Sequence, residues 1–132
     1  MNIKYSPVIQ AWQPYWASVP QIDFVVLIGS QLSGTADAAS DWDLAIALAP
    51  QLDAIARYDL LADLQIQLAA LSGVAVDDLD LIDLARSGLA MREQVANHGL
   101  VLHGGDTLAW SRFMVRTWRD LEMQQWEQQH AA

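Results

Sequence analysis

Two short polar motifs, each beside an apolar run, could together bind the phosphates of a nucleotide and a metal ion. Gly29-Ser30 ends the apolar run 24–28, and after ten intervening residues Asp41-Trp42-Asp43 leads a second apolar run, 44–48. Gly29 lets the backbone turn sharply and lets a ligand approach where a Cβ would clash. Ser30 can donate hydrogen bonds from its amide and hydroxyl to a terminal phosphate.

Asp41 and Asp43 supply two carboxylates to the same side of the second predicted strand, because alternate strand residues point the same way. Adjacent carboxylates repel each other unless a cation lies between them. Mg²⁺ prefers oxygen ligands and is usually held by one or two carboxylates plus substrate phosphates, so it is the expected cation. The pattern therefore predicts a metal site that faces the Gly29-Ser30 turn at the end of a buried strand.

The composition indicates a single cytoplasmic domain over residues 1–132. The chain is 53% hydrophobic, yet no apolar run reaches the roughly 18 residues of a membrane span, and the N-terminus lacks the apolar segment of a signal peptide. It has no cysteine, which excludes disulfides and thiolate metal sites and fits a reducing compartment. With a net charge of −9 and only seven Lys plus Arg, we expect no direct nucleic-acid substrate. We expect no membrane partner either.

The spacing of apolar residues predicts helices around these strands. Ser6-Pro7 is a favourable start for the first helix, which Pro14 should kink or restart. A second, amphipathic helix is expected over residues 52–71, with Asp53 and Arg57 as an i,i+4 ion pair on its outer side. A third is expected over residues 86–98.

The third helix should end at Gly99 in the left-handed conformation that favours glycine. His98, in its last turn, is expected to complement the helix dipole rather than to bind a ligand. Histidines at positions 98, 103 and 130 are too scattered for a zinc site.

The last helix is expected over residues 106–129 and has two different sides. Its apolar side carries Trp110, Phe113, Met114, Trp118 and Leu121. Arg112, Arg116 and Arg119 cluster on the opposite side, as the helical period requires, with Trp126 near them. This stripe holds three of the seven basic residues. It is either an ordinary solvated face or a partner-docking surface, since Arg and Trp are favoured interface anchors.

Gly29-Ser30, a ten-residue gap and Asp41-x-Asp43 resemble the signature of the DNA polymerase β-type nucleotidyltransferases, in the small form called minimal nucleotidyltransferases. Gly34 falls where that family usually has a loop glycine. Residues 80–84 resemble the strand with the third carboxylate, and residues 99–102 resemble the closing segment. The resemblance implies an α/β (α+β) fold, in which a core over about residues 22–103 forms a small mixed β-sheet with flanking helices, followed by a long C-terminal helix.

The resemblance also implies the site residues. Catalytic and metal-binding roles fall on Asp41, Asp43 and Asp80, which would hold two Mg²⁺ ions, and nucleotide-binding roles fall on Gly29, Ser30 and Ser40. If the register of the third strand is shifted by one residue pair, Asp78 takes the place of Asp80. An acceptor hydroxyl deprotonated near the third carboxylate would attack the α-phosphorus of ATP, and pyrophosphate would leave.

Freestanding minimal nucleotidyltransferases are frequently antitoxins encoded beside an all-helical HEPN ribonuclease toxin. The implied function is transfer of AMP from ATP to a tyrosine of that toxin, which blocks its ribonuclease site. A small-molecule acceptor of the aminoglycoside type is the alternative, although only about 30 residues follow the last predicted strand.

Gln31 and Ser33 stand where many relatives have arginines near the triphosphate. This departure leaves two non-enzymatic alternatives, an antitoxin that acts by binding alone and a nucleotide-sensing domain. Retention of Gly29, Ser30 and the clustered carboxylates argues against an inactive site, because close carboxylates repel one another.

Overall fold

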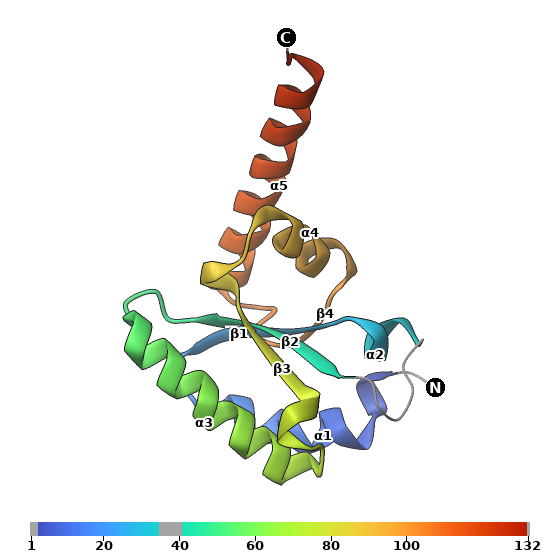
Figure 1. Cartoon of the computed structure of the whole chain (residues 1–132), viewed down its shortest axis with the longest axis vertical. Coiled ribbons are helices and arrows are strands. Elements are labelled where there is room, and N and C mark those ends of the chain that lie inside the picture. Colours follow the sequence, from blue (N-terminus) through green and yellow to red (C-terminus); the bar gives the residue numbers. More distant parts are fainter. Residues whose placement is uncertain (1–2, 35–40, 132) are drawn as a thin grey trace.

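A computed structural model, which describes residues 3–34 and 41–131, has a four-stranded mixed β-sheet at its centre in the order β3-β2-β1-β4 (Figure 1). β1 (Ile22–Ile28) pairs antiparallel with both β2 (Trp42–Leu48) and β4 (Leu100–His103). β2 pairs parallel with β3 (Leu79–Asp83), which is an edge strand. The expected mixed sheet with flanking helices is confirmed.

Two helices cover each face of the sheet (Figure 1). One face carries α1 (Pro7–Trp16) and α3 (Ala54–Ser72), and the other carries α4 (Leu89–His98) and α5 (Leu108–Gln129). The short elements are α2 (Ser30–Ser33), η1 (Ile3–Tyr5), η2 (Val76–Asp78) and η3 (Leu84–Arg86). None of the helices in the described ranges is long and apolar enough to cross a membrane.

β1 is apolar at almost every position because both of its faces are covered. Val25 and Leu27 pack in the core beneath α1 and α3, whereas Phe24, Val26 and Ile28 pack in the core beneath α4 and α5. Burial on both faces explains why the strand reads as a continuous apolar run rather than an alternating one.

Three tryptophans fix α1 against the sheet and α3. Trp12 meets Trp16 and Trp42 edge-to-face, with ring centroids 6.3 and 5.4 Å apart, and its Nε1 donates to the Leu68 carbonyl at 3.0 Å. Of the two outcomes expected at Pro14, the restart is wrong, since α1 continues through it to Trp16, and the kink stays a prediction. Pro14 lies in the last turn, between two fully buried tryptophans whose packing holds the helix together.

The expected outer ion pair of Asp53 and Arg57 is also wrong. Asp53 is the N-cap of α3 and accepts a 2.8 Å hydrogen bond from the Ala56 amide. Arg57 is buried and pairs with Asp83 instead. Asp53 caps the helix instead of pairing with Arg57, because its carboxylate accepts a hydrogen bond from an amide that has no partner within the helix.

Gly99 does not adopt the expected left-handed conformation, since its φ is −85°. A Cβ at this position would overlap the Val26 side chain and lie 2.7 Å from the Val95 carbonyl oxygen. Glycine is required here because α4 turns into β4 directly against β1 and leaves no room for a Cβ. The backbone angle itself does not require glycine.

α5 packs on the molecule as far as about residue 121 (Figure 1). Trp110 and Phe113 lie against Phe24, with ring centroids 5.0 and 5.3 Å from it, and Arg92 of α4 donates to Asp120 at 2.8 Å. Residues 122–131 are all exposed. The long C-terminal helix is confirmed, and its last turns extend away from the sheet.

Candidate active site

The end of β1 lies directly against the start of β2. Ile28 is opposite Asp43 in the antiparallel register, and Gly29 follows with a φ of +86°, in the region that favours glycine. A Cβ on Gly29 would overlap Oδ2 of Asp43 and lie 3.2 Å from its Cγ. The turn that begins α2 at Ser30 is therefore in contact with a carboxylate, and only glycine fits there.

Asp43 and Asp80 are direct partners in the parallel register of β2 and β3. Asp78 lies in η2, before the strand begins. Asp43 is half-buried, whereas Asp41 and Asp80 are exposed. The register thus brings Asp80, rather than Asp78, beside Asp43.

The pKa of Asp43 is raised above its ordinary value. Partial burial is the largest cause, followed by the negative charges of Asp80 and Asp41 and a side-chain hydrogen bond with Asp80. Each cause disfavours a second or third negative charge in the same place. Three neighbouring carboxylates with unrelieved repulsion are a suitable donor set for a hard divalent cation.

These carboxylates do not by themselves form a complete set of metal ligands. No three His, Cys, Asp or Glu side chains in the part of the chain that the structure describes are already arranged as ligands of one ion. The preformed part is the Asp43–Asp80 pair, and Mg²⁺ usually takes its other ligands from water and substrate phosphates. Of the nucleotide-binding residues expected from the sequence, Gly29 and Ser30 lie at this site, whereas Ser40 lies outside the described residues.

A cavity of about 440 Å³ opens between the Gly29 turn and α4. Its lining consists of Gly29, Leu32, Ser33, Gln94 and His98. The volume is in the range of small-molecule sites. The helical spacing of Gln94 and His98 shows that they share a face of α4, but no local pattern indicates that this face lies over the turn.

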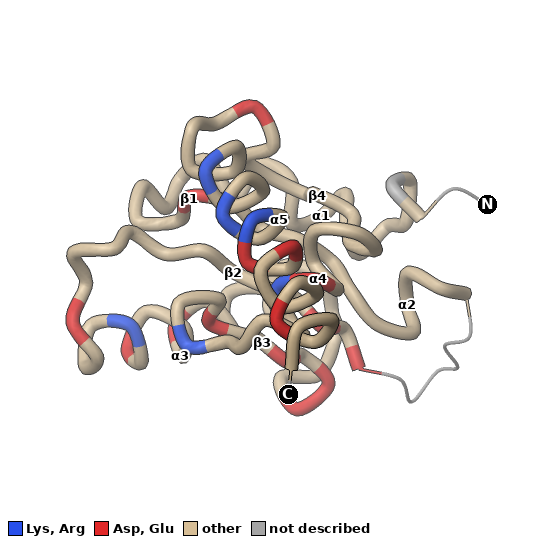
Figure 2. Tube along the Cα trace, turned by 90° about the horizontal axis from the view of Figure 1, so that it is seen from above, with Lys and Arg blue, Asp and Glu red and all other residues tan. Residues whose placement is uncertain are grey.

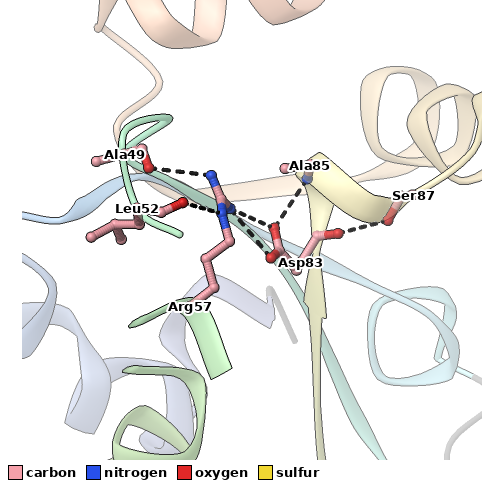
Figure 3. A network of polar contacts seen from close by, with 6 residues as sticks. All are labelled: Ala49, Leu52, Arg57, Asp83, Ala85 and Ser87. Atoms are coloured by element: carbon pink, nitrogen blue, oxygen red, sulfur yellow. Dashed lines mark hydrogen bonds and ion pairs between the residues drawn. The ribbon is translucent and has the colours of Figure 1, made fainter. Parts of the chain in front are cut away.

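A buried ion pair anchors the far end of β3 (Figure 3). Arg57 of α3 donates from Nη1 to Asp83 at 3.1 and 3.3 Å. It also donates from Nη2 to the Ala49 carbonyl at 3.2 Å and from Nε to the Leu52 carbonyl at 3.0 Å. The network joins α3, the segment after β2 and the strand that carries Asp80.

Comparison with known protein families identifies the family of this chain. The family described as "Polymerase beta, Nucleotidyltransferase" matches residues 10–107. The chain belongs to this nucleotidyltransferase family. The family resemblance inferred from Gly29-Ser30 and Asp41-x-Asp43 is therefore confirmed.

Among named relatives, the protein adenylyltransferase MntA of Shewanella oneidensis is 33% identical over 87 residues, or 66% of this chain. The match spans 58% of that relative, less than two thirds of its length.

Two solved structures can be aligned with more than nine tenths of this chain. A chain of a toxin–antitoxin crystal structure with AMP-PNP is 29% identical, with a TM-score of 0.64 over 98% of this chain and 94% of that one. Another match is a chain from the structure of a complex, the tri-AMPylated Shewanella oneidensis HEPN toxin with MNT antitoxin. That chain is 28% identical to this one, with a TM-score of 0.58 over 92% of both chains.

Proposed function

We propose that this chain is an antitoxin that transfers AMP from ATP to a tyrosine hydroxyl of a cognate HEPN-type ribonuclease toxin and so neutralises it. The observation that carries the transfer reaction is the Asp43–Asp80 pair held against Gly29. The acceptor is proposed from the relatives, which include a protein adenylyltransferase and an antitoxin in complex with an AMPylated HEPN toxin.

Each site residue then has a role in binding ATP. Gly29 leaves room for the phosphates to approach the backbone, and Ser30 donates hydrogen bonds to them. Asp43, Asp80 and Asp41 are the residues that would hold two Mg²⁺ ions. When bound, these ions neutralise the carboxylates and stabilise the charge on the phosphates and on leaving pyrophosphate.

The transfer step conserves atoms and charge. The tyrosine oxygen forms a bond to the α-phosphorus, the bond from that phosphorus to the β-phosphate breaks, and pyrophosphate leaves with the electron pair. The tyrosine proton passes to the Asp80 carboxylate and then to solvent. Asp80 is exposed and lies on the edge strand of the sheet, so a side chain on another protein can reach it.

The test is intact-mass spectrometry of the HEPN toxin encoded by the adjacent gene, after incubation with this chain, ATP and Mg²⁺. We expect a mass gain of whole AMP units that disappears with Asp41→Asn/Asp43→Asn. Asp59→Asn/Asp63→Asn is the matched control, because it also removes two carboxylates but from the exposed side of α3. This control should retain the full mass gain.

Other outcomes would identify another function. If the toxin is bound and silenced without a mass gain, the chain neutralises by binding alone. If an aminoglycoside gains AMP and the toxin does not, the acceptor is a small molecule.

A further inference from the structure

One side of α5 carries positive charge that the transfer reaction does not use. Arg112, Arg116 and Arg119 are all exposed and follow one another at helical spacing, and Figure 2 shows them as a row along the helix. They are three of the seven basic residues in a chain of net charge −9. We call these three residues the α5 arginine surface.

A first cavity opens beside this surface, at the end of the sheet remote from Asp43. It has a volume of about 380 Å³ and lies between α5, the start of β1 and the end of β2. Arg112 and Arg116 form part of its wall, while Phe24, Leu84 and Phe113 give it apolar walls. Asp23 and Arg57, which pairs with Asp83, also line it. The cavity can therefore receive an apolar side chain next to the guanidinium groups of Arg112 and Arg116.

A second cavity of about 450 Å³ continues along the same side of α5. All three members of the α5 arginine surface line it, together with Leu108 and Val115. Leu108 and Val115 are 62% and 65% exposed. Apolar and cationic side chains thus alternate over a continuous surface, which is typical of interfaces rather than of a merely solvated helix face.

The positive charge is largely uncompensated within the chain. The Arg112 side chain makes no hydrogen bond or ion pair with any residue of the described ranges. Arg116 and Arg119 lie near Asp120, and this carboxylate is already bonded to Arg92. The guanidinium groups are free to form the two-point hydrogen bonds with carboxylates for which arginine is suited.

We infer that the α5 arginine surface docks an acidic segment of a partner protein. Its Asp or Glu side chains would pair with the arginines, and one aromatic or aliphatic side chain would enter the cavity beside Phe24 and Phe113. A nucleic acid also offers anions, but its phosphates continue along its whole length and would meet the negative charge of the rest of the chain, whereas a short acidic segment meets only the α5 arginine surface. Docking here leaves Asp43 and Asp80, at the opposite end of the sheet, free for the acceptor.

The inference takes from the proposed function only the identity of the partner, the adjacent-gene HEPN toxin. The test measures its dissociation constant for the full chain carrying Asp41→Asn/Asp43→Asn, so that no transfer occurs. We call the Asp41→Asn/Asp43→Asn chain the parent chain. In this background we expect Arg112→Glu and Arg116→Glu each to weaken toxin binding about tenfold. Added salt should weaken toxin binding by the parent chain more than by either arginine variant. Arg86→Glu is the matched control, since Arg86 is exposed and lines neither cavity. It should change binding less than twofold.

The outcomes separate the two proposals. If both variants bind the toxin as Arg86→Glu does, the docking surface is wrong, while AMP transfer by the wild-type chain would still support the proposed function. If the parent chain does not bind the toxin, the proposed partner and this surface both fail. If a single-stranded RNA binds in an Arg112-dependent way and the toxin does not, the surface recognises nucleic acid instead. Unchanged thermal melting of Arg112→Glu excludes unfolding as the cause of weaker binding.

Discussion

Gly29 and Asp43 lie so close together that a Cβ on Gly29 would overlap a carboxylate oxygen of Asp43. The two residues come from neighbouring antiparallel strands, and the pairing of Ile28 with Asp43 fixes the distance between them. The ten residues that separate Ser30 from Asp41 in the sequence therefore do not have to set this geometry. The glycine turn and the aspartates act as one unit because of strand pairing.

This contact predicts that Gly29→Ala displaces the Asp43 carboxylate. We expect AMP transfer to fall about 100-fold, since small displacements of reacting groups have effects of that size. Gly73→Ala is the matched control, because Gly73 also has a positive φ, of +79°, but a Cβ there meets nothing within 4 Å. Gly73→Ala should lose about 1–2 kcal/mol of unfolding free energy from its left-handed backbone. Gly29→Ala should lose at least as much, because its φ is also positive and its Cβ meets Asp43.

Transfer rates and urea unfolding of the two variants separate strain from contact. Gly73→Ala should lose stability and keep its transfer rate. Equal losses of activity in both variants would show that backbone strain, and not the Asp43 contact, makes Gly29 necessary.

The raised pKa of Asp43 predicts how stability depends on pH without metal. Because the folded chain holds this proton more tightly than the unfolded chain, stability should fall as pH rises from the ordinary aspartate pKa through the raised one. Asp43→Asn removes that loss, so we expect a higher Tm than wild type at pH 7.5 in EDTA. Mg²⁺ should then raise the Tm of wild type and leave that of Asp43→Asn unchanged.

Asp59→Asn is the control for this measurement, because it removes an exposed carboxylate of α3 that lies away from the site. It should melt as the wild type does and respond to Mg²⁺ in the same way. A lower Tm for Asp43→Asn in EDTA would contradict the view that the carboxylates repel one another in the folded chain.

The register of β2 and β3 predicts different effects for two nearby aspartates. Asp80 is the partner of Asp43, so Asp80→Asn should reduce transfer about 100-fold or more, the usual scale for losing an acid–base group. Asp78 lies in η2, and Asp78→Asn should keep transfer within twofold of wild type. Initial rates at saturating ATP would decide between them, and the reverse order of effects would assign the third carboxylate to Asp78.

The sequence was sufficient for features that depend on local patterns. The apolar run that ends at Gly29, the Ser6 cap and the long last helix follow from periodicity and capping. The choice between Asp78 and Asp80 required the register of a parallel pair, which no local pattern specifies. For the same reason, the position of His98 over the Gly29 turn depends on where α4 packs.

Arg57 shows how a local rule can select the wrong partner. Helical spacing favours Asp53, four residues away, but the partner is Asp83, which is 26 residues away. The Asp53 carboxylate instead accepts a hydrogen bond from the Ala56 amide at the start of the helix. Long-range pairs of this kind depend on the packing of α3 against β3, and an amphipathic pattern does not determine that packing.

The Arg57–Asp83 pair is also expected to stabilise the chain strongly. Both side chains are at most 10% exposed, so Arg57→Met should cost about 3–5 kcal/mol of unfolding free energy by leaving a buried carboxylate unpaired. Arg57→Met/Asp83→Leu should recover part of this loss. Arg92→Met is the comparison, because its partner Asp120 is 39% exposed, and it should cost much less than Arg57→Met. Urea unfolding of the four proteins measures each value.

His98 and Gln94 are predicted to contact the nucleotide. They line the cavity that includes Gly29, and none of the residues lining it is Arg or Lys, so hydrogen bonds from α4 are available where cations are not. Each lost hydrogen bond is worth about 1 kcal/mol, so His98→Ala and Gln94→Ala should each weaken AMP-PNP binding about fivefold in calorimetry. His130→Ala, at the exposed end of α5, should leave binding unchanged.

Nε2 of His98 also lies 3.8 Å from Oε1 of Glu93, so Glu93→Gln tests whether that pair contributes to nucleotide binding. If Glu93→Gln weakens binding as much as His98→Ala does, His98 acts by positioning the end of α4 and not by touching the nucleotide.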